Sequence, residues 1–125
     1  MAPPKEVSIA QGVAVDFSVA EGTPHVIAYR FWLQTPGSTT WKLIGEGRTN
    51  DDTLDHFVVT DPIASGTIFA YTLAVGGAAN SPWRANIAVA QPGSPTGGAW
   101  NETGVVSDDD GKLGHEVRTT KVKLK

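Results

Sequence analysis

Residues 25–34 read HVIAYRFWLQ, and their side chains alternate in character along the chain. In an extended conformation one face carries large apolar side chains, namely Ile27, Tyr29, Phe31 and Leu33. The other face includes Arg30 and Trp32 and is also fairly apolar. A period of two predicts a β-strand. Apolar residues on both faces predict that this strand lies in the centre of a sheet.

The same period recurs on both sides of this segment. Residues 12–20 alternate cleanly before it, and further strands are expected at residues 41–44, 54–60, 67–75 and 83–91. Turn sequences rich in glycine, proline and aspartate separate these runs, and no segment has a sustained helical period. Short strands spaced about ten residues apart with such turns predict an antiparallel sandwich or barrel.

The composition changes at residues 92–98, which read PGSPTGG and predict a connector. Two more strands are expected beyond it, joined by residues 108–111, DDDG. An Asp-Gly pair supplies the positive φ angles of a tight hairpin. We therefore predict one all-β domain over residues 1–125, with a core sandwich at 5–91 and an appended C-terminal β-hairpin at 99–124.

The middle of the chain resembles a fibronectin type III module, one of the immunoglobulin-like sandwiches. Residues 28–32 and 41–43 are similar to the paired third and fourth strands of that family. Residues 66–75 and 80–82 are similar to its sixth strand and the following loop. The resemblance covers about residues 5–91, and it implies a non-catalytic spacer or binding unit.

Composition excludes several classes of protein. The 125 residues carry a net charge of −3, which argues against nucleic acid as the main partner. Cysteine is absent, so disulfides and thiolate metal sites are ruled out. No apolar run approaches the length of a membrane span. The N-terminus lacks the apolar stretch of a signal peptide, which predicts a cytoplasmic protein or one released by a non-classical route.

The sequence contains no motif for catalysis, neither a nucleophile elbow, nor a P-loop, nor a dinucleotide fingerprint. We therefore predict that the protein is not an enzyme and has no cofactor. Two acidic clusters are candidate calcium sites because calcium prefers oxygen ligands. They are Asp51, Asp52, Asp55 and His56, and then Asp108, Asp109, Asp110, His115 and Glu116. Asp108 and Asp110 have the spacing that begins a calcium loop, but Gly111 follows too early, so a solvated turn is favoured.

The four tryptophans are the strongest indication of a binding site. Aromatic rings are enriched at interfaces and stack on the C–H faces of sugars. Trp83 and Trp100 begin strands near loops, where the binding sites of sandwiches usually lie, and are expected to reach the surface. The predicted ligand-binding residues are Trp83, Trp100, Trp41, Asn80 and Asn101.

In the C-terminal strand, Lys121, Lys123 and Lys125 share one face, and Val122 and Leu124 share the other. An edge strand protected from aggregation by its lysines is favoured. A stripe for an anionic partner, and pairing with a second copy of the chain into a homo-oligomer, remain open.

The sequence therefore predicts a non-enzymatic recognition module, carbohydrate-binding or adhesive, whose partner is a glycan or another protein. The alternative is a structural or assembly protein, such as a phage or self-associating bacterial component, that acts through protein–protein contacts.

Overall fold

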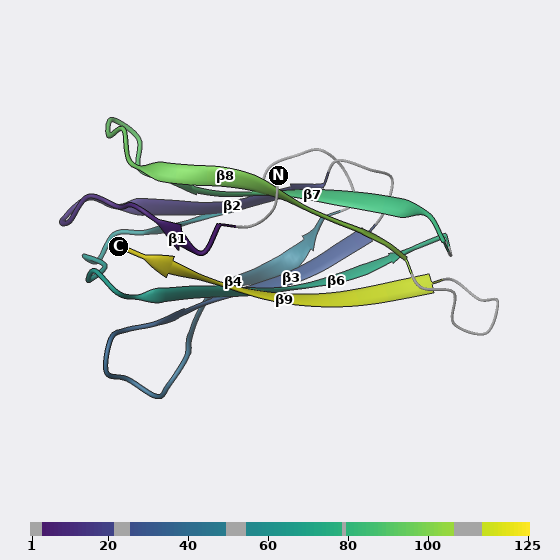
Figure 1. The fold of residues 1–125 in the computed structure, drawn as a ribbon, viewed down its shortest axis with the longest axis horizontal. Coiled ribbons are helices and arrows are strands. Elements are labelled where there is room, and N and C mark those ends of the chain that lie inside the picture. Colours follow the sequence, from purple (N-terminus) through teal and green to yellow (C-terminus); the bar gives the residue numbers. More distant parts are fainter. Residues whose placement is uncertain (1–3, 22–25, 50–54, 79, 107–113) are drawn as a thin grey trace.

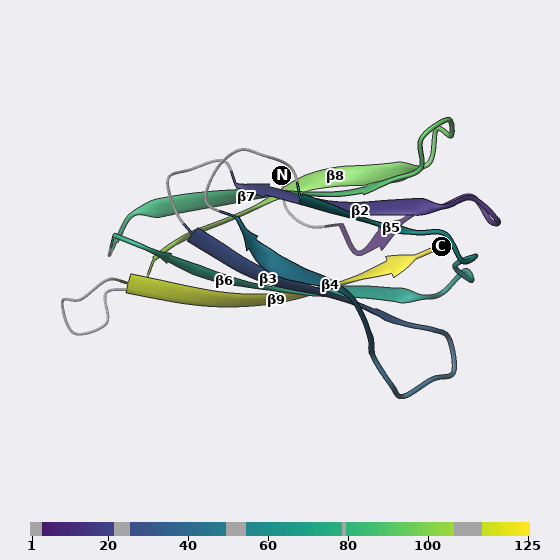
Figure 2. The same ribbon diagram turned by 180° about the vertical axis from the view of Figure 1, so that it is seen from behind.

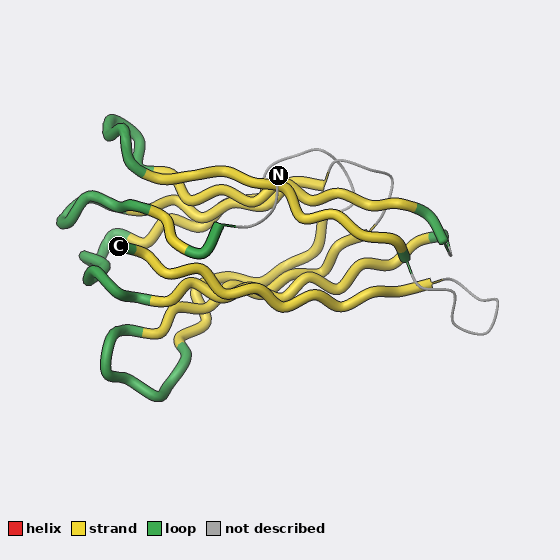
Figure 3. The backbone as a smooth tube through the Cα atoms, in the orientation of Figure 1, coloured by secondary structure: helices red, strands yellow, loops and turns green. Residues whose placement is uncertain are grey.

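Two β-sheets pack face to face in the computed structural model (Figure 1). The structure describes residues 4–21, 26–49, 55–78, 80–106 and 114–125. Strands and loops account for all of these described residues (Figure 3). The protein is therefore an all-β sandwich.

Five strands form the first sheet, in the order β1-β9-β6-β3-β4. They are β1 (Glu6–Val7), β9 (Gly114–Leu124), β6 (Ile68–Gly77), β3 (Val26–Gln34) and β4 (Lys42–Thr49). The second sheet has the order β5-β2-β7-β8. Its strands are β5 (Asp55–Val59), β2 (Val15–Glu21), β7 (Pro82–Ala90) and β8 (Gly97–Val105). All pairs are antiparallel except β1 with β9.

The strand predicted at 25–34 is β3, and it lies inside the first sheet between β6 and β4. Its predicted apolar face is the core face, where Ile27, Tyr29, Phe31 and Leu33 are all buried. Aromatic rings from several strands meet there: the Phe17 and Phe69 ring centroids lie 4.7 Å apart, and those of Phe31 and Phe69 lie 5.3 Å apart. The sheets are thus joined by aromatic packing without disulfides.

The predicted hairpin at 99–124 is wrong. Strand β8 pairs with β7 in one sheet, and β9 pairs with β6 in the other. Residues 106–113 separate β8 from β9, which is longer than the usual hairpin loop and long enough to cross the roughly 10 Å between packed sheets. Seen from both sides, the C-terminal strand is part of the five-stranded layer (Figures 1 and 2).

The predicted connector at 92–98 is also wrong, because it lies within a hairpin. Strands β7 and β8 pair from Pro82↔Val105 to Ala90↔Gly97, so residues 91–96 are the hairpin loop. Gly93 and Gly97 have φ angles of 84° and 111°, which favour glycine. A Cβ on Gly97 would lie 2.4 Å from the Val89 carbonyl oxygen, so this position excludes any side chain.

The strand predicted at residues 41–44 is longer in the structure, where residues 45–49 continue β4 in place of a turn. Two glycines make room for rings on the core side of this strand. A Cβ on Gly45 would lie 2.5 Å from the Phe57 ring, and a Cβ on Gly47 would lie 2.5 Å from the Tyr29 hydroxyl. Glycine at these two positions therefore allows the rings of Phe57 and Tyr29 to pack closely against β4.

Candidate functional site

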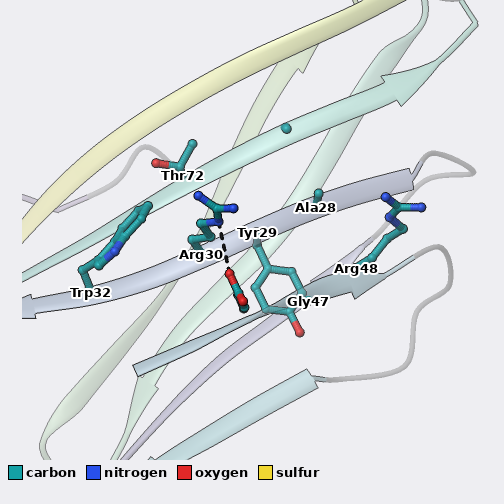
Figure 4. A pocket seen from close by; sticks show the side chains of 9 residues that line it. Ala28, Tyr29, Arg30, Trp32, Gly47, Arg48 and Thr72 are labelled. Carbon is teal, nitrogen blue, oxygen red and sulfur yellow. Dashed lines mark ion pairs between the residues drawn. The ribbon is translucent and has the colours of Figure 1, made fainter. Parts of the chain in front are cut away.

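The outer face of the five-stranded sheet is hollowed into a shallow groove of about 840 Å³ over β3, β4 and β6. It is lined by Ala28, Tyr29, Arg30, Trp32, Glu46, Gly47, Arg48, Thr72 and Ala74. Trp32 and Arg48 lie toward opposite ends of the groove, with Arg30 between them (Figure 4). The small side chains of Ala28, Thr72 and Ala74 leave the space between the longer ones.

Strand register explains why these side chains are neighbours. Trp32 is opposite Ala70, which is opposite Lys121 on the far side of β6. One step along, Arg30 is opposite both Thr72 and Glu46. Adjacent strands lie about 4.8 Å apart, so each such row forms a continuous band across the sheet. The first of these rows brings together Trp32 and Lys121, which are nearly ninety positions apart in the sequence.

A smaller cavity of about 260 Å³ shares Trp32 with the groove. Its walls are Trp32, Trp41, Ala70, Thr119 and Lys121. Trp41 is 38% exposed, and the Lys121 ammonium lies 5.5 Å from the centroid of its ring. A cation at this distance from an indole face is attracted to it. The cavity therefore combines an accessible aromatic ring with a positive charge.

Charged groups line the groove. The Arg30 Nε atom lies 3.2 Å from a Glu46 carboxylate oxygen, and both side chains are more than half exposed. An exposed ion pair stabilises a fold by only about 0–1 kcal/mol, so little is lost if a ligand replaces one partner. Both groups can therefore form hydrogen bonds with a polar ligand in the groove.

Only one of the three predicted tryptophans belongs to this surface. Trp41 lies on it, but Trp83 and Trp100 are 1% and 3% exposed and belong to the core. The prediction that these two rings reach the surface is wrong, because their strands turn the tryptophan-bearing face toward the other sheet. Asn80 is exposed with a φ of 62°, in the turn between β6 and β7, and Asn101 is half-buried on β8. The structure does not bring these two asparagines to Trp41.

Sequence reasoning did not select Trp32 or Arg30 as site residues, and it considered Lys121 only within the lysine stripe that an anionic partner could bind. The sequence does contain a pattern that could have identified Arg30 and Trp32, since the alternation in residues 26–34 places both on the same face. Nothing in the local pattern indicated that Lys121 would lie beside them. Its position follows from the pairing of β6 with β9.

A polar network crosses the core away from the groove. The Tyr71 hydroxyl donates a hydrogen bond of 2.7 Å to Oε2 of Glu102, which is 2% exposed. The same hydroxyl accepts one of 2.8 Å from Nε1 of Trp100. The Thr120 hydroxyl also donates to Glu102 Oε2. These contacts join β6 and β9 to β8, so Trp100 links the two sheets.

Both tyrosines of the chain have raised pKa values. Burial is the main cause at each, because it disfavours the charged phenolate. Asp55 raises the pKa of Tyr29 further, since its carboxylate accepts the phenol's hydrogen bond at 2.7 Å. Glu102 does the same for Tyr71.

The fold is therefore expected to lose stability in alkali. Unfolded tyrosine has a pKa of about 10. Because the folded pKa values are higher, their stabilising contribution is complete below pH 10 and is lost as the pH rises from there toward the folded values. Phenolate absorbance should stay low near pH 10 and then rise together with the loss of circular dichroism. A rise at pH 10 in folded protein would contradict this, and Tyr71→Phe should weaken the pH dependence.

The acidic residues show no metal centre in the part of the chain that the structure describes. Asp55 accepts the Tyr29 hydrogen bond, and His56 Nδ1 lies 3.2 Å from an Asp16 oxygen. Asp51, Asp52 and the weak calcium candidates Asp108, Asp109 and Asp110 lie outside the described residues. The side chains of His115 and Glu116 are likewise not described.

No helix long and apolar enough to cross a membrane occurs among the described residues. The chain matches no protein-family model, no curated protein and no solved structure. The function is therefore inferred from the geometry of the outer face.

Proposed function

We propose that this protein is a non-enzymatic carbohydrate-binding module whose site is the outer face of β4, β3, β6 and β9. One observation carries the proposal: Trp41 and Trp32 line one cavity, and Trp32 also lines the larger groove beside it. An exposed indole can stack on the C–H face of a sugar ring. Arg30, Glu46 and Thr72 can then form hydrogen bonds with hydroxyl groups along the groove.

We also propose that the strands of the sandwich have an immunoglobulin-like topology, in agreement with the resemblance to fibronectin type III modules. The pairs β2–β5, β3–β6 and β6–β9 correspond to the B–E, C–F and F–G pairs of such sandwiches. On this reading the β7–β8 hairpin is inserted before the last strand, and β7 pairs with β2. Rigid strands then present the aromatic site.

A glycan array followed by titration calorimetry on the best sugar tests the proposal. Trp41→Ala should weaken binding about tenfold or more, as expected for an anchoring aromatic residue. Trp41→Phe should retain part of the affinity, because it keeps a ring. Val58→Ala removes an exposed apolar side chain from the other sheet and should change nothing. The absence of any sugar hit, or equal binding by Trp41→Ala, would overturn the proposal.

A second candidate function is self-assembly, favoured by the edge of β9. Among the described strands, β1 covers that edge only opposite Lys123 and Leu124. The remaining backbone groups along this edge could pair with a strand of a second copy. Light scattering over a wide concentration range should then show a mass that increases with concentration. A constant monomer mass would rule out this function.

A further inference from the structure

Positive charge gathers on the outer face, although the whole chain has a net charge of −3. Among the described side chains, five cations lie on this face or at its edge beside β1. They are Arg30, Arg48, Lys121, Lys123 and Lys125. Its two carboxylates are each paired with one of them, Glu46 with Arg30 and Glu6 with Lys125. Arg48, Lys121 and Lys123 therefore have no carboxylate partner within the described part of the chain.

These cations flank the proposed sugar site. Lys121 lies over the Trp41 ring, so a sugar stacked in this cavity would place its substituents near the ammonium. Arg48 lines the groove at the end away from Trp32. The rows of Trp32 and Arg48 are four residues apart on β3, or about 13 Å at the usual rise of a strand. More than one sugar ring fits between them.

Lysines on a strand are often only solvated charges that prevent aggregation. That explanation does not account for Lys121, whose ammonium lies over a ring in the wall of a cavity. Nor does it account for the contrast between an acidic chain and this cationic face. An anionic ligand would neutralise like charges that otherwise repel one another.

We propose that the glycan bound on this face is acidic and carries carboxylate or sulfate groups that contact Lys121 and Arg48. This inference rests on the proposed function and specifies its class of ligand. Carboxylate and sulfate share the chemistry that matters, an anionic oxygen group that accepts hydrogen bonds from ammonium and guanidinium. Trp41 supplies the stacking that distinguishes a sugar from other polyanions.

Two matched pairs of probes test the inference by calorimetry at low and high salt. Polygalacturonate is compared with its methyl ester, and dextran sulfate with dextran. We expect binding to the acidic member of at least one pair, weaker binding to its neutral counterpart, and loss of that difference at high salt. The pair that responds identifies the source of the charge.

Variants locate the contact. Lys121→Gln and Arg48→Gln should each weaken binding of the acidic polymer about two- to fivefold at low salt, the range of exposed ion pairs. Arg84→Gln removes an equal charge from the exposed face of the other sheet and should have no effect. Lys121→Gln and Arg48→Gln replace exposed side chains, so the melting temperatures of these two variants should match that of the parent protein.

The outcomes separate this inference from the proposed function. Equal binding of acidic and neutral probes, with Trp41→Ala weakened and Lys121→Gln unchanged, would overturn the acidic ligand and leave the sugar site standing. Binding of acidic polymers that Trp41→Ala does not weaken, and that polyglutamate or DNA reproduces, would overturn both. So would the absence of binding to every glycan.

Discussion

Replacing Trp83 with alanine is expected to lower the free energy of unfolding by about 3–5 kcal/mol, the range for deleting a large buried ring. Trp83 is 1% exposed and lies on the core face of β7, in line with Ala85, Ile87 and Val89. No neighbouring side chain can fill the space of an indole without repacking. Since a domain of this kind has only about 5–15 kcal/mol of stability, the loss is a large part of the total.

Equilibrium unfolding in urea measures this loss. Trp41→Ala is the matched control, because Trp41 is 38% exposed and its loss should cost about 1 kcal/mol or less. If Trp83→Ala does not fold at all, Trp83→Phe should still fold with an intermediate stability. Equal losses for Trp83→Ala and Trp41→Ala would show that Trp83 is not in the core.

Replacing Glu102 with leucine is expected to cost about 2–4 kcal/mol, although leucine is more apolar than glutamate. The Tyr71 and Thr120 hydroxyls would lose the oxygen to which both donate. A buried donor without an acceptor costs about 1–3 kcal/mol. Glu102→Gln keeps a carbonyl oxygen in the same place and should lose less.

A double-mutant cycle checks that the network causes the loss. Thr120→Val removes one of the two donors, so adding it to Glu102→Leu should restore part of the stability. Chemical unfolding of the four proteins gives the coupling free energy. Additive losses would mean that Thr120 and Glu102 do not interact, and a more stable Glu102→Leu would mean that apolar packing outweighs the lost hydrogen bonds.

The positions of the strands could be predicted because a strand's period is local. Residues 25–34 gave β3 within one residue. The lysines of β9 were placed on the face opposite Val122 and Leu124, and these two apolar residues are buried. The same alternation could have placed Trp83 in the core, since it shares a face with Ala85, Ile87 and Val89. The expectation that a residue at the start of a strand is exposed misled the prediction there.

Of the five predicted ligand-binding residues, only Trp41 belongs to the candidate site. Alternation states which residues share a face, but it does not state which face another sheet will cover. For β3 both faces are apolar, and only the packing of the second sheet made Arg30 and Trp32 the outer residues. Lys121 joins them through the register of β6 with β9, a contact between distant segments.

The sequence is enough to establish an all-β chain, the approximate limits of its strands and the residues that share a side of each strand. These properties follow from the two-residue period and from turn residues that act over a few positions. Tertiary structure alone decided that β8 and β9 belong to different sheets and that Trp100 is buried beside Tyr71. It also decided that Trp41, Trp32 and Lys121 share one cavity. The physical reason is that strand partners and burial depend on segments far apart in the chain, which no local pattern records.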